Sequence, residues 1–440
     1  MGERKILSSW KEIANYLKIR VRTAQRWEEK LGLPVHRMEK LNKTYVFAYV
    51  DEIDRWLDEK SQKEKSSKKS LLKNKKLIFG LIFSILLISA SILFLRLSTH
   101  SNNLIPSDFK INNSQLVIYN NSGKKLWNYD LQTQIDPVEY KWKDFTGRKS
   151  HSNIPLNVFF QDIDHDNRIN VIFVAQTKYN SNEKVLCFDE KGKLLWSFKP
   201  GREIKYGDYL ISPDFDIRLV RVIDLNNDGF FEIVIIANHK IHFPTRVTVL
   251  NYKGKIIGEY WNSGHLPCVE FLDLNDDGLK EIILGGVNNN YRKACLVVLD
   301  IRKIEGSSPQ VKGSRYYSEE LKAGTEKYYI LIPPNELGKL FHIYECVSSI
   351  DIFKEKRIEI CTNFSKIIYD FDYQMRANYV YFGDKFMFQY EKLKREGKIN
   401  KPLSSFDKNK LISDILYWDG EKWIQKPTMT KFWKNYESKS

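Results

Sequence analysis

The sequence predicts a multidomain fold with three parts: a small α-helical winged helix-turn-helix, a single transmembrane helix, and an all-β propeller of about six blades, with seven the alternative. Three observations predict it. Apolar residues follow helical spacing near the N-terminus, nineteen consecutive residues carry no charge, and one aspartate-rich loop recurs between strand-like runs. The predicted parts are the helix-turn-helix unit 1–59, a basic linker 60–76, the membrane helix 77–96, a second linker 97–109 and the propeller 110–440.

The first unit begins at a capping box, Ser9 to Glu12, which predicts the start of a helix. Apolar residues at helical spacing continue this helix and, after a short break, a second one. Gly32 and Pro34 predict the end of the second helix. Two strand-like runs with a turn between them predict a hairpin before a third helix. The predicted elements are helices near 9–17, 22–30 and 51–59, and strands at 36–38 and 44–47.

The excess positive charge is densest at this end of the chain. Residues 1–76 hold twenty Lys or Arg and eleven Asp or Glu, which gives +9 of the total +15. Such a balance indicates a polyanionic partner, either nucleic acid or lipid headgroups. Arginine and glutamine can read base edges in a major groove, and basic side chains on a hairpin can contact phosphates. The candidate residues are Arg20, Arg22, Thr23, Gln25 and Arg26 on the second helix, and Arg37, Lys40 and Lys43 on the hairpin. Charge alone is equally consistent with solvated side chains on a small helical module.

A family resemblance extends over about residues 7–58. It is carried by Val21, Arg22, Thr23, Arg26, Trp27, Glu28 and the run Gly32-Leu33-Pro34. This pattern resembles the DNA-binding domain of the MerR and excisionase type. The resemblance implies a homodimer on DNA, with the second helix in the major groove and the hairpin wing on the backbone. One feature departs from MerR proteins: the dimerising coiled coil is missing, because residues 60–76 contain no heptad of apolar residues.

The uncharged stretch is Leu77 to Leu95. As a helix it would extend roughly 28 Å, about the thickness of the hydrocarbon core of a bilayer. A buried core helix would show a polar face, and a signal peptide would begin the chain. Eight lysines lie between Lys60 and Lys76, whereas Arg96 is followed by no Lys or Arg before Lys110. The positive-inside rule therefore predicts a single-pass inner (plasma) membrane protein with a cytoplasmic N-terminus and an extracytoplasmic propeller.

Three segments of the C-terminal part align without gaps. They run from Asp162 to Asn170, Asp224 to Glu232 and Asp273 to Glu281, each between two apolar runs. A hairpin begins 23 residues after the start of each segment, and a worn fourth copy lies at 351–359. A fixed phase between two motifs indicates a structural repeat. Units of about four short strands over roughly 50–70 residues are typical of a β-propeller closed by strands from both ends.

The loop pattern resembles the FG-GAP or VCBS repeats of integrin-α-type propellers. The resemblance implies Ca²⁺ bound by side chains at loop positions 1, 3, 5 and 9. An EF-hand is the competing interpretation, but it needs a glutamate at position 12, where this chain has Phe173, Ile235 and Leu284. Another alternative is that the carboxylates only cap the turns. The implied ligands are Asp224, Asn226, Asp228 and Glu232, then Asp273, Asn275, Asp277 and Glu281, and less strongly Asp162, Asp164 and Asp166.

These features together predict a membrane-tethered DNA-binding transcription regulator whose propeller senses an external ligand or protein. The sensing half rests on the juxtaposition of domains alone. An envelope adhesion or scaffold protein with a cytoplasmic binding module is the alternative. No catalytic constellation is evident, so we expect no enzyme, although hairpins such as Lys193–Trp196 resemble quinoprotein repeats. The five cysteines are odd in number, so they cannot all pair; Cys346 and Cys361 could meet across a hairpin in an oxidising compartment, and the sequence leaves open whether they are bonded.

Overall fold

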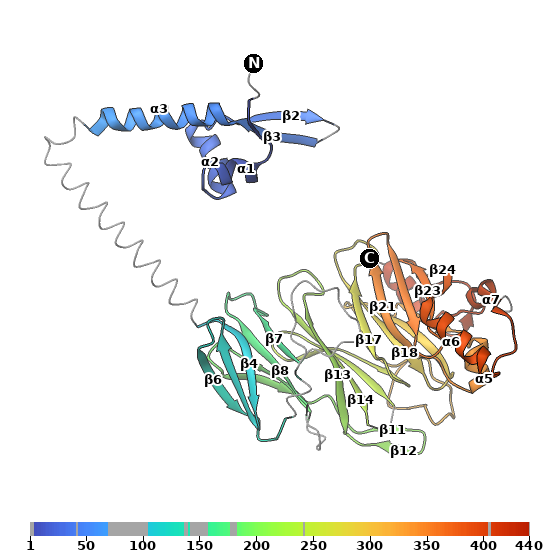
Figure 1. Ribbon diagram of the computed structural model, residues 1–440. Coiled ribbons are helices and arrows are strands. Elements are labelled where there is room, and N and C mark those ends of the chain that lie inside the picture. Colours follow the sequence, from blue (N-terminus) through green and yellow to red (C-terminus); the bar gives the residue numbers. More distant parts are fainter. Residues whose placement is uncertain are drawn as a thin grey trace. The chain divides into compact units, whose positions relative to one another are not determined.

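The computed structural model describes residues 4–40, 43–68, 104–135, 140, 157–176, 183–240, 243–403 and 406–439. The chain divides into two compact units, Met1–Thr99 and His100–Ser440 (Figure 1). The predicted span at 77–96 lies outside the described residues. Among those described, no helix is long and apolar enough to cross a membrane. The prediction of a single-pass inner-membrane location is therefore corrected, because no helix in the described part of the chain supports it.

The small unit combines three helices with a sheet. Its elements are β1 (Ile6–Leu7), α1 (Trp10–Tyr16), α2 (Val21–Leu31), β2 (His36–Lys40), β3 (Lys43–Tyr49) and α3 (Val50–Lys68). The strands pair antiparallel in the order β1-β3-β2. The sequence predicted the hairpin of β2 and β3 but not β1, which adds a third strand to it. It also ended the third helix too early, since α3 continues to Lys68.

The predicted capping box at the start of α1 is confirmed. The Ser9 hydroxyl accepts a hydrogen bond from the Glu12 amide at 3.3 Å, and the Glu12 carboxylate accepts one from the Ser8 amide at 2.9 Å. These contacts satisfy amides that the first turn of a helix leaves unpaired. Gly32 caps the C-terminal end of α2 in the left-handed conformation, with a φ of 66°. Glycine adopts this left-handed conformation without the steric cost of a Cβ.

One apolar core holds the helices of the small unit against its sheet. Ile13, Ala24, Ala48 and Ile53 are fully or almost fully buried in it. The indole of Trp56 on α3 donates a hydrogen bond to the Leu31 carbonyl at 3.0 Å, and its ring lies 5.9 Å from that of Trp27. The inner face of α2 is thus fixed by packing, and its other face is left to solvent.

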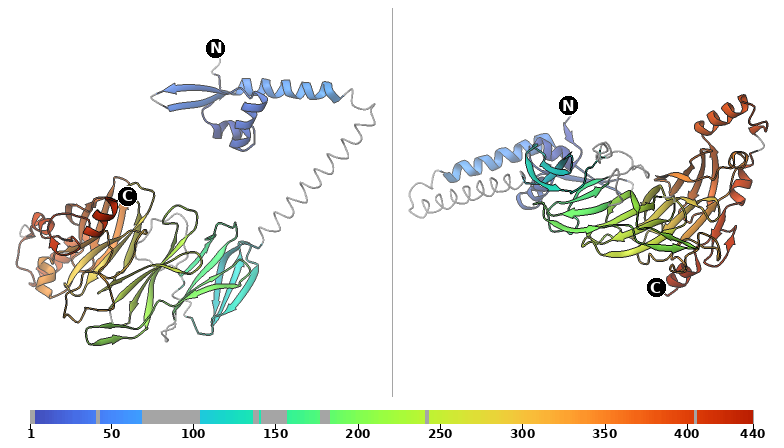
Figure 2. Two further views of the ribbon diagram at one scale, coloured as in Figure 1. Left: turned by 180° about the vertical axis from the view of Figure 1, so that it is seen from behind. Right: turned by 90° about the horizontal axis from the view of Figure 1, so that it is seen from below.

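The large unit consists mostly of antiparallel sheets that follow one another in chain order from one end to the other (Figures 1 and 2). The first sheet contains β4 (Pro106–Asn112), β5 (Gln115–Asn120) and β6 (Lys125–Asp130). The second contains β7 (Val158–Gln161), β8 (Asn170–Ala175), β9 (Lys184–Phe188) and β10 (Leu194–Phe198). A small hairpin of β11 (Ile204–Tyr206) and β12 (Tyr209–Ile211) follows. The next sheet contains β13 (Phe215–Ile223), β14 (Glu232–His239), β15 (Thr245–Leu250) and β16 (Ile256–Asn262).

The C-terminal strands of the chain extend one of the last two sheets. One contains β17 (Cys268–Leu272), β18 (Glu281–Asn288), β19 (Lys293–Leu299) and β20 (Tyr328–Ile332), extended by β25 (Leu416–Trp418) and β26 (Trp423–Ile424). The other contains β21 (Val347–Phe353), β22 (Arg357–Thr362), β23 (Ile367–Asp372) and β24 (Ala377–Phe382). The central strands β8, β14 and β18 are buried nearly throughout, because the sheets pack face to face.

The predicted fold class is therefore wrong in its third part as well. A closed propeller required the last strands to pair with the first sheet. Instead β25 pairs with β20, at Ile330 with Tyr417 and Leu331 with Leu416. In the described part of the chain the sheets form an open row, and no closed propeller ring is present.

The large unit is not all β either. Helices α5 (Glu336–Phe341), α6 (Asp384–Arg395), α7 (Lys408–Ser413) and α8 (Lys431–Glu437) lie in its last third. Trp433 of α8 is completely buried, and its indole donates to the Thr325 carbonyl at 2.7 Å. Residues 384–395 show why these helices were missed: apolar residues at helical spacing lay inside a region assigned to strands by its repeat.

Candidate nucleic-acid interface and metal-binding loops

The outer face of α2 brings together five of the residues predicted to contact DNA. Arg22, Gln25 and Arg26 are exposed and lie on one side of the helix, while Ala24 on the other side is completely buried. A surface depression of about 520 Å³ is lined by Arg20, Arg22, Thr23, Gln25 and Arg26, together with Glu29 and Lys30. No hydrogen bond or ion pair within the described residues occupies the Arg22 or Arg26 guanidinium. Both are therefore available to an external acceptor.

Arg37 has a different environment from the other predicted contact residues. Its guanidinium donates two hydrogen bonds to the Glu28 carboxylate, at 2.6 and 2.9 Å. This pairing raises the pKa of Arg37. The pair joins β2 of the hairpin to α2, so the structure gives Arg37 an internal partner in place of the predicted phosphate. The motif had identified Glu28 only as part of a family pattern, and its role in fixing the wing was missed.

Lys40 and Lys43 are directly opposite each other at the end of the β2–β3 hairpin. Their side chains and residues 41–42 lie outside the described part of the chain. The exposed cross-strand pair next to them is Met38 with Tyr45, which are 53% and 50% exposed. The hairpin therefore extends from the core as a wing whose backbone is defined up to the two lysines.

The three aspartate loops of the large unit follow the same backbone path. Position 4 of each loop has a positive φ, with 59° at His165, 57° at Asn227 and 61° at Asp276. Position 6 is also left-handed, at Asn167 in the first loop and at glycines in the other two. Asparagine tolerates this conformation better than most residues. The lack of a glycine at position 6 therefore does not prevent the first loop from adopting the same backbone conformation as the other two.

The acidic side chains of the first loop converge. Carboxylate oxygens of Asp162, Asp164 and Asp166 all lie within 4.8 Å of one another. Asp164 Oδ1 is buried and has no hydrogen-bond partner among the described residues. Burial, followed by the charges of the other two aspartates, raises the pKa of Asp164. A group of oxygen ligands with an unsatisfied carboxylate fits a hard divalent cation.

The second loop has a similar arrangement, with Asn226 in place of the middle aspartate and Glu232 in place of Asn170. Asp224 Oδ1 is buried without a hydrogen-bond partner among the described residues. Asn226 instead donates to Asp228 at 2.9 Å, so these two side chains contact each other. Glu232, at position 9, accepts from the Leu225 amide at 3.0 Å, and burial raises its pKa to about 7. Glu232 therefore closes the loop, as Asn170 does in the first one by accepting from the Ile163 amide.

The third loop is already neutralised by basic side chains of the protein. Glu281 is 2.7 Å from the buried Lys327 ammonium, and Asp277 is 3.3 Å from the Arg302 guanidinium. Lys327 and Arg302 are also paired with Asp300. Two of the four predicted ligands are thus held by internal cations, which does not fit a metal site. No sequence signal pointed to Lys327, because it lies 46 residues from Glu281 in the chain.

The structure also decides the predictions for the fourth copy of the loop and for the cysteines. In the worn fourth copy, Asp351 and Glu359 are opposite each other on β21 and β22, so no loop of the same kind forms. All five cysteines are described and all are free. Burial raises the pKa of the Cys346 thiol to about 12. Cys346 and Cys361, the pair that the sequence left open, are not joined by a disulfide.

No protein-family model matches the sequence, and no curated protein matches it. Three solved structures show distant likeness. The V. cholerae biofilm matrix protein Bap1 is 11% identical (TM-score 0.26), a protein of unknown function from Bacteroides caccae is 9% identical (0.23), and the Dos1 propeller is 7% identical (0.27). The matches cover 61%, 62% and 60% of this chain and 36%, 90% and 63% of those chains. The chain thus spans about a third of the length of Bap1. The C-terminal region is β-rich.

Proposed function

We propose that this protein is a sequence-specific DNA-binding regulator whose small unit reads DNA in the manner of MerR and excisionase proteins. The observation that supports it is the outer face of α2. Arginine, glutamine and threonine side chains lie together there without internal partners, on a helix whose inner face is fixed by the core. A helix of this kind fits a major groove, and Arg and Gln match guanine and adenine edges.

The hairpin supports the same proposal. The Glu28–Arg37 pair connects the wing to the reading helix, so the two surfaces would meet DNA in a defined geometry. Lys40 and Lys43 at the hairpin end supply charge for the phosphate backbone. The large unit is then the part that receives a ligand or partner, and a homodimer matches the paired half-sites of such operators.

The test is specific DNA binding by the full chain, measured by fluorescence anisotropy on duplexes selected from random sequence. Arg22→Ala and Arg26→Ala are each expected to reduce affinity for the selected site by roughly 10- to 100-fold. Arg55→Ala, an exposed arginine on α3, is the matched control and should change affinity by less than about threefold. Equal binding of selected and scrambled duplexes would instead support the scaffold alternative.

We also infer that the first two aspartate loops bind Ca²⁺, because each contains a buried carboxylate oxygen without a partner. The bound ion would offset the repulsion among these carboxylates and stabilise the turns. Equilibrium dialysis of the full chain should show bound Ca²⁺ that decreases by one ion in Asp162→Asn. Asp273→Asn in the third loop should leave the amount unchanged. An equal loss in both variants would contradict this assignment of the loops.

A further inference from the structure

Helix α6 of the large unit presents a second basic face, which lies far along the chain from α2 and from the aspartate loops. Its inner residues Phe386, Tyr390 and Leu393 are buried in the core of the last sheet. Its outer residues Lys385, Phe388, Gln389 and Lys392 have the spacing of one helical stripe. Phe388 is 70% exposed, the largest value among the exposed large apolar residues of the described chain. The ring of Phe388 is not part of the core, whereas Phe386, two residues earlier, is completely buried there.

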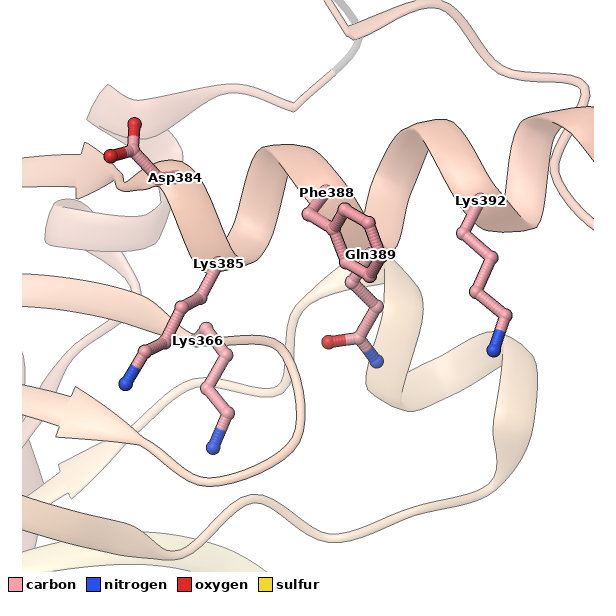
Figure 3. Close-up of a pocket in the computed structure, with 6 residues that line it drawn as sticks. All are labelled: Lys366, Asp384, Lys385, Phe388, Gln389 and Lys392. Carbon is pink, nitrogen blue, oxygen red and sulfur yellow. The ribbon is translucent and has the colours of Figure 1, made fainter.

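Lys366 extends the same surface from another element. It occupies the turn between β22 and β23, with a φ of 57°. Figure 3 shows its side chain beside Lys385, with Gln389 and Lys392 on the same side of the helix, whereas Asp384 points away. Together these residues line a shallow depression of about 490 Å³. The surface therefore combines three ammonium groups, an amide and an aromatic ring.

Two of the three lysines on this surface have no counterion among the described residues. No ion pair of the described residues involves Lys366 or Lys385, and Lys392 is 4.0 Å from Glu396 at its nearest. Basic residues farther along are paired: Lys398 lies 2.8 Å from Glu396 and Lys401 lies 2.7 Å from Glu336. Near Phe388, the ammonium groups of Lys366 and Lys385 therefore have no ion-pair partner among the described residues, and they would attract an anion.

We propose that this surface docks an acidic peptide segment of a partner protein, with an apolar side chain of the partner placed on Phe388. Lys385 and Lys392 are separated by about 10 Å along the helix axis, the length of about three residues of extended chain. In an extended peptide, side chains four residues apart lie on the same face about 13 Å apart, a separation that the flexible lysine side chains can match. The ring between them would serve as the anchor that most interfaces place at their centre.

The mixed charge around the stripe argues against nucleic acid as the occupant. Asp384, Glu391 and Glu396 are exposed on the same helix and its end. Duplex DNA carries one charge per about 1.7 Å and would be repelled by these carboxylates. A peptide carries fewer, more widely spaced charges and can avoid them.

The experiment measures binding of a short fluorescein-labelled peptide to the full chain. The peptide has two glutamates four positions apart, with phenylalanine midway between them on the same face and leucine next to it. Phe388→Ala should weaken binding by about tenfold or more. Lys366→Gln combined with Lys385→Gln should weaken it by about fivefold at low salt and reduce its salt dependence.

Matched controls separate this surface from general effects. Tyr209→Ala removes an aromatic ring that is 65% exposed elsewhere, and Lys394→Gln removes a lysine on α6 outside the stripe. Both should bind the peptide within about twofold of the wild type. The proposal is overturned by absence of binding, by equal binding of a peptide with both apolar residues replaced by serine, or by tighter binding of oligothymidine that is insensitive to Phe388→Ala.

Discussion

Helices α2 and α6 are both basic on the outside and apolar on the inside, yet their outer faces differ in chemistry. The face of α2 carries arginines with glutamine and threonine, and it lacks an aromatic residue. The face of α6 carries lysines around Phe388. Arginine offers a planar fork that matches base edges, whereas lysine offers a point charge. The difference teaches that net charge alone does not identify the partner. The geometry of the donors and the presence of an apolar anchor decide between DNA and protein.

The largest expected effect separates the two faces of α6. Phe386 is completely buried and stacks on Phe382 at 4.4 Å, whereas Phe388 lies mostly in solvent. Phe386→Ala should lower the free energy of unfolding by about 3–5 kcal/mol. Phe388→Ala should change it by less than about 0.5 kcal/mol. Urea denaturation of the full chain, followed by tryptophan fluorescence, measures both. Similar losses in the two variants would mean that Phe388 is part of the core and not a docking residue.

A second prediction concerns a buried acid beneath the surface of the large unit. Burial raises the pKa of Glu326 from 4.5 to about 7, so the folded protein holds this proton more tightly than the unfolded chain. This contribution to stability is present at low pH and is lost as the pH rises from about 4.5 through 7. Glu326→Gln should therefore be more stable than the wild type at pH 8 by roughly 1–3 kcal/mol.

The control for this effect is the same variant at pH 5, where the difference should largely disappear. Glu183, whose pKa is also raised by burial to about 7, remains in the variant and leaves part of the slope in place. A pH profile of unfolding that is parallel in Glu326→Gln and wild type would show that Glu326 does not titrate in this range.

The exchange of arginine and lysine tests the comparison of the two helices directly. Arg26→Lys on α2 keeps the charge but loses the fork, so specific DNA affinity should decrease by about tenfold. Lys385→Arg on α6 should leave peptide affinity within about twofold, because a point charge is sufficient there. Titrations of both variants with both ligands give four affinities. An unchanged DNA affinity in Arg26→Lys would mean that this residue contacts phosphate and not a base.

The smallest effect concerns the link between the wing and α2. Glu28→Gln replaces the charged partner of Arg37 with an amide and should lower the melting temperature only slightly, because the pair is exposed. The release of Arg37 should also change DNA affinity by a few-fold, and thermal denaturation with and without DNA measures the two separately. Arg55 is 3.9 Å from its nearest carboxylate, so Arg55→Ala should change neither stability nor DNA affinity. Equal behaviour of the two variants would remove the wing-positioning role of Glu28.

Local features were predictable from the sequence, and long-range pairing was not. The capping box at Ser9 and the loop spacing depend on neighbouring residues, and the structure confirms both elements. The pairing of β20 with β25 and the contact of Lys327 with Glu281 join segments that are far apart in the chain. A periodic sequence pattern therefore could not predict them. The repeat therefore suggested a closed propeller, whereas the described sheets form an open row. It also suggested three equivalent loops, whereas Lys327 and Arg302 neutralise the third loop.

The most direct test of the proposed function is selection of random duplex DNA by the full chain, followed by titrations at two salt concentrations. A sequence reader retains a preference of about a hundredfold or more for the selected site at the higher salt, because base contacts are less sensitive to salt than phosphate contacts. That preference should be reduced in Arg22→Ala and unchanged in Arg55→Ala. Loss of affinity for all sequences alike at the higher salt would contradict the account and leave α2 as a non-specific basic surface.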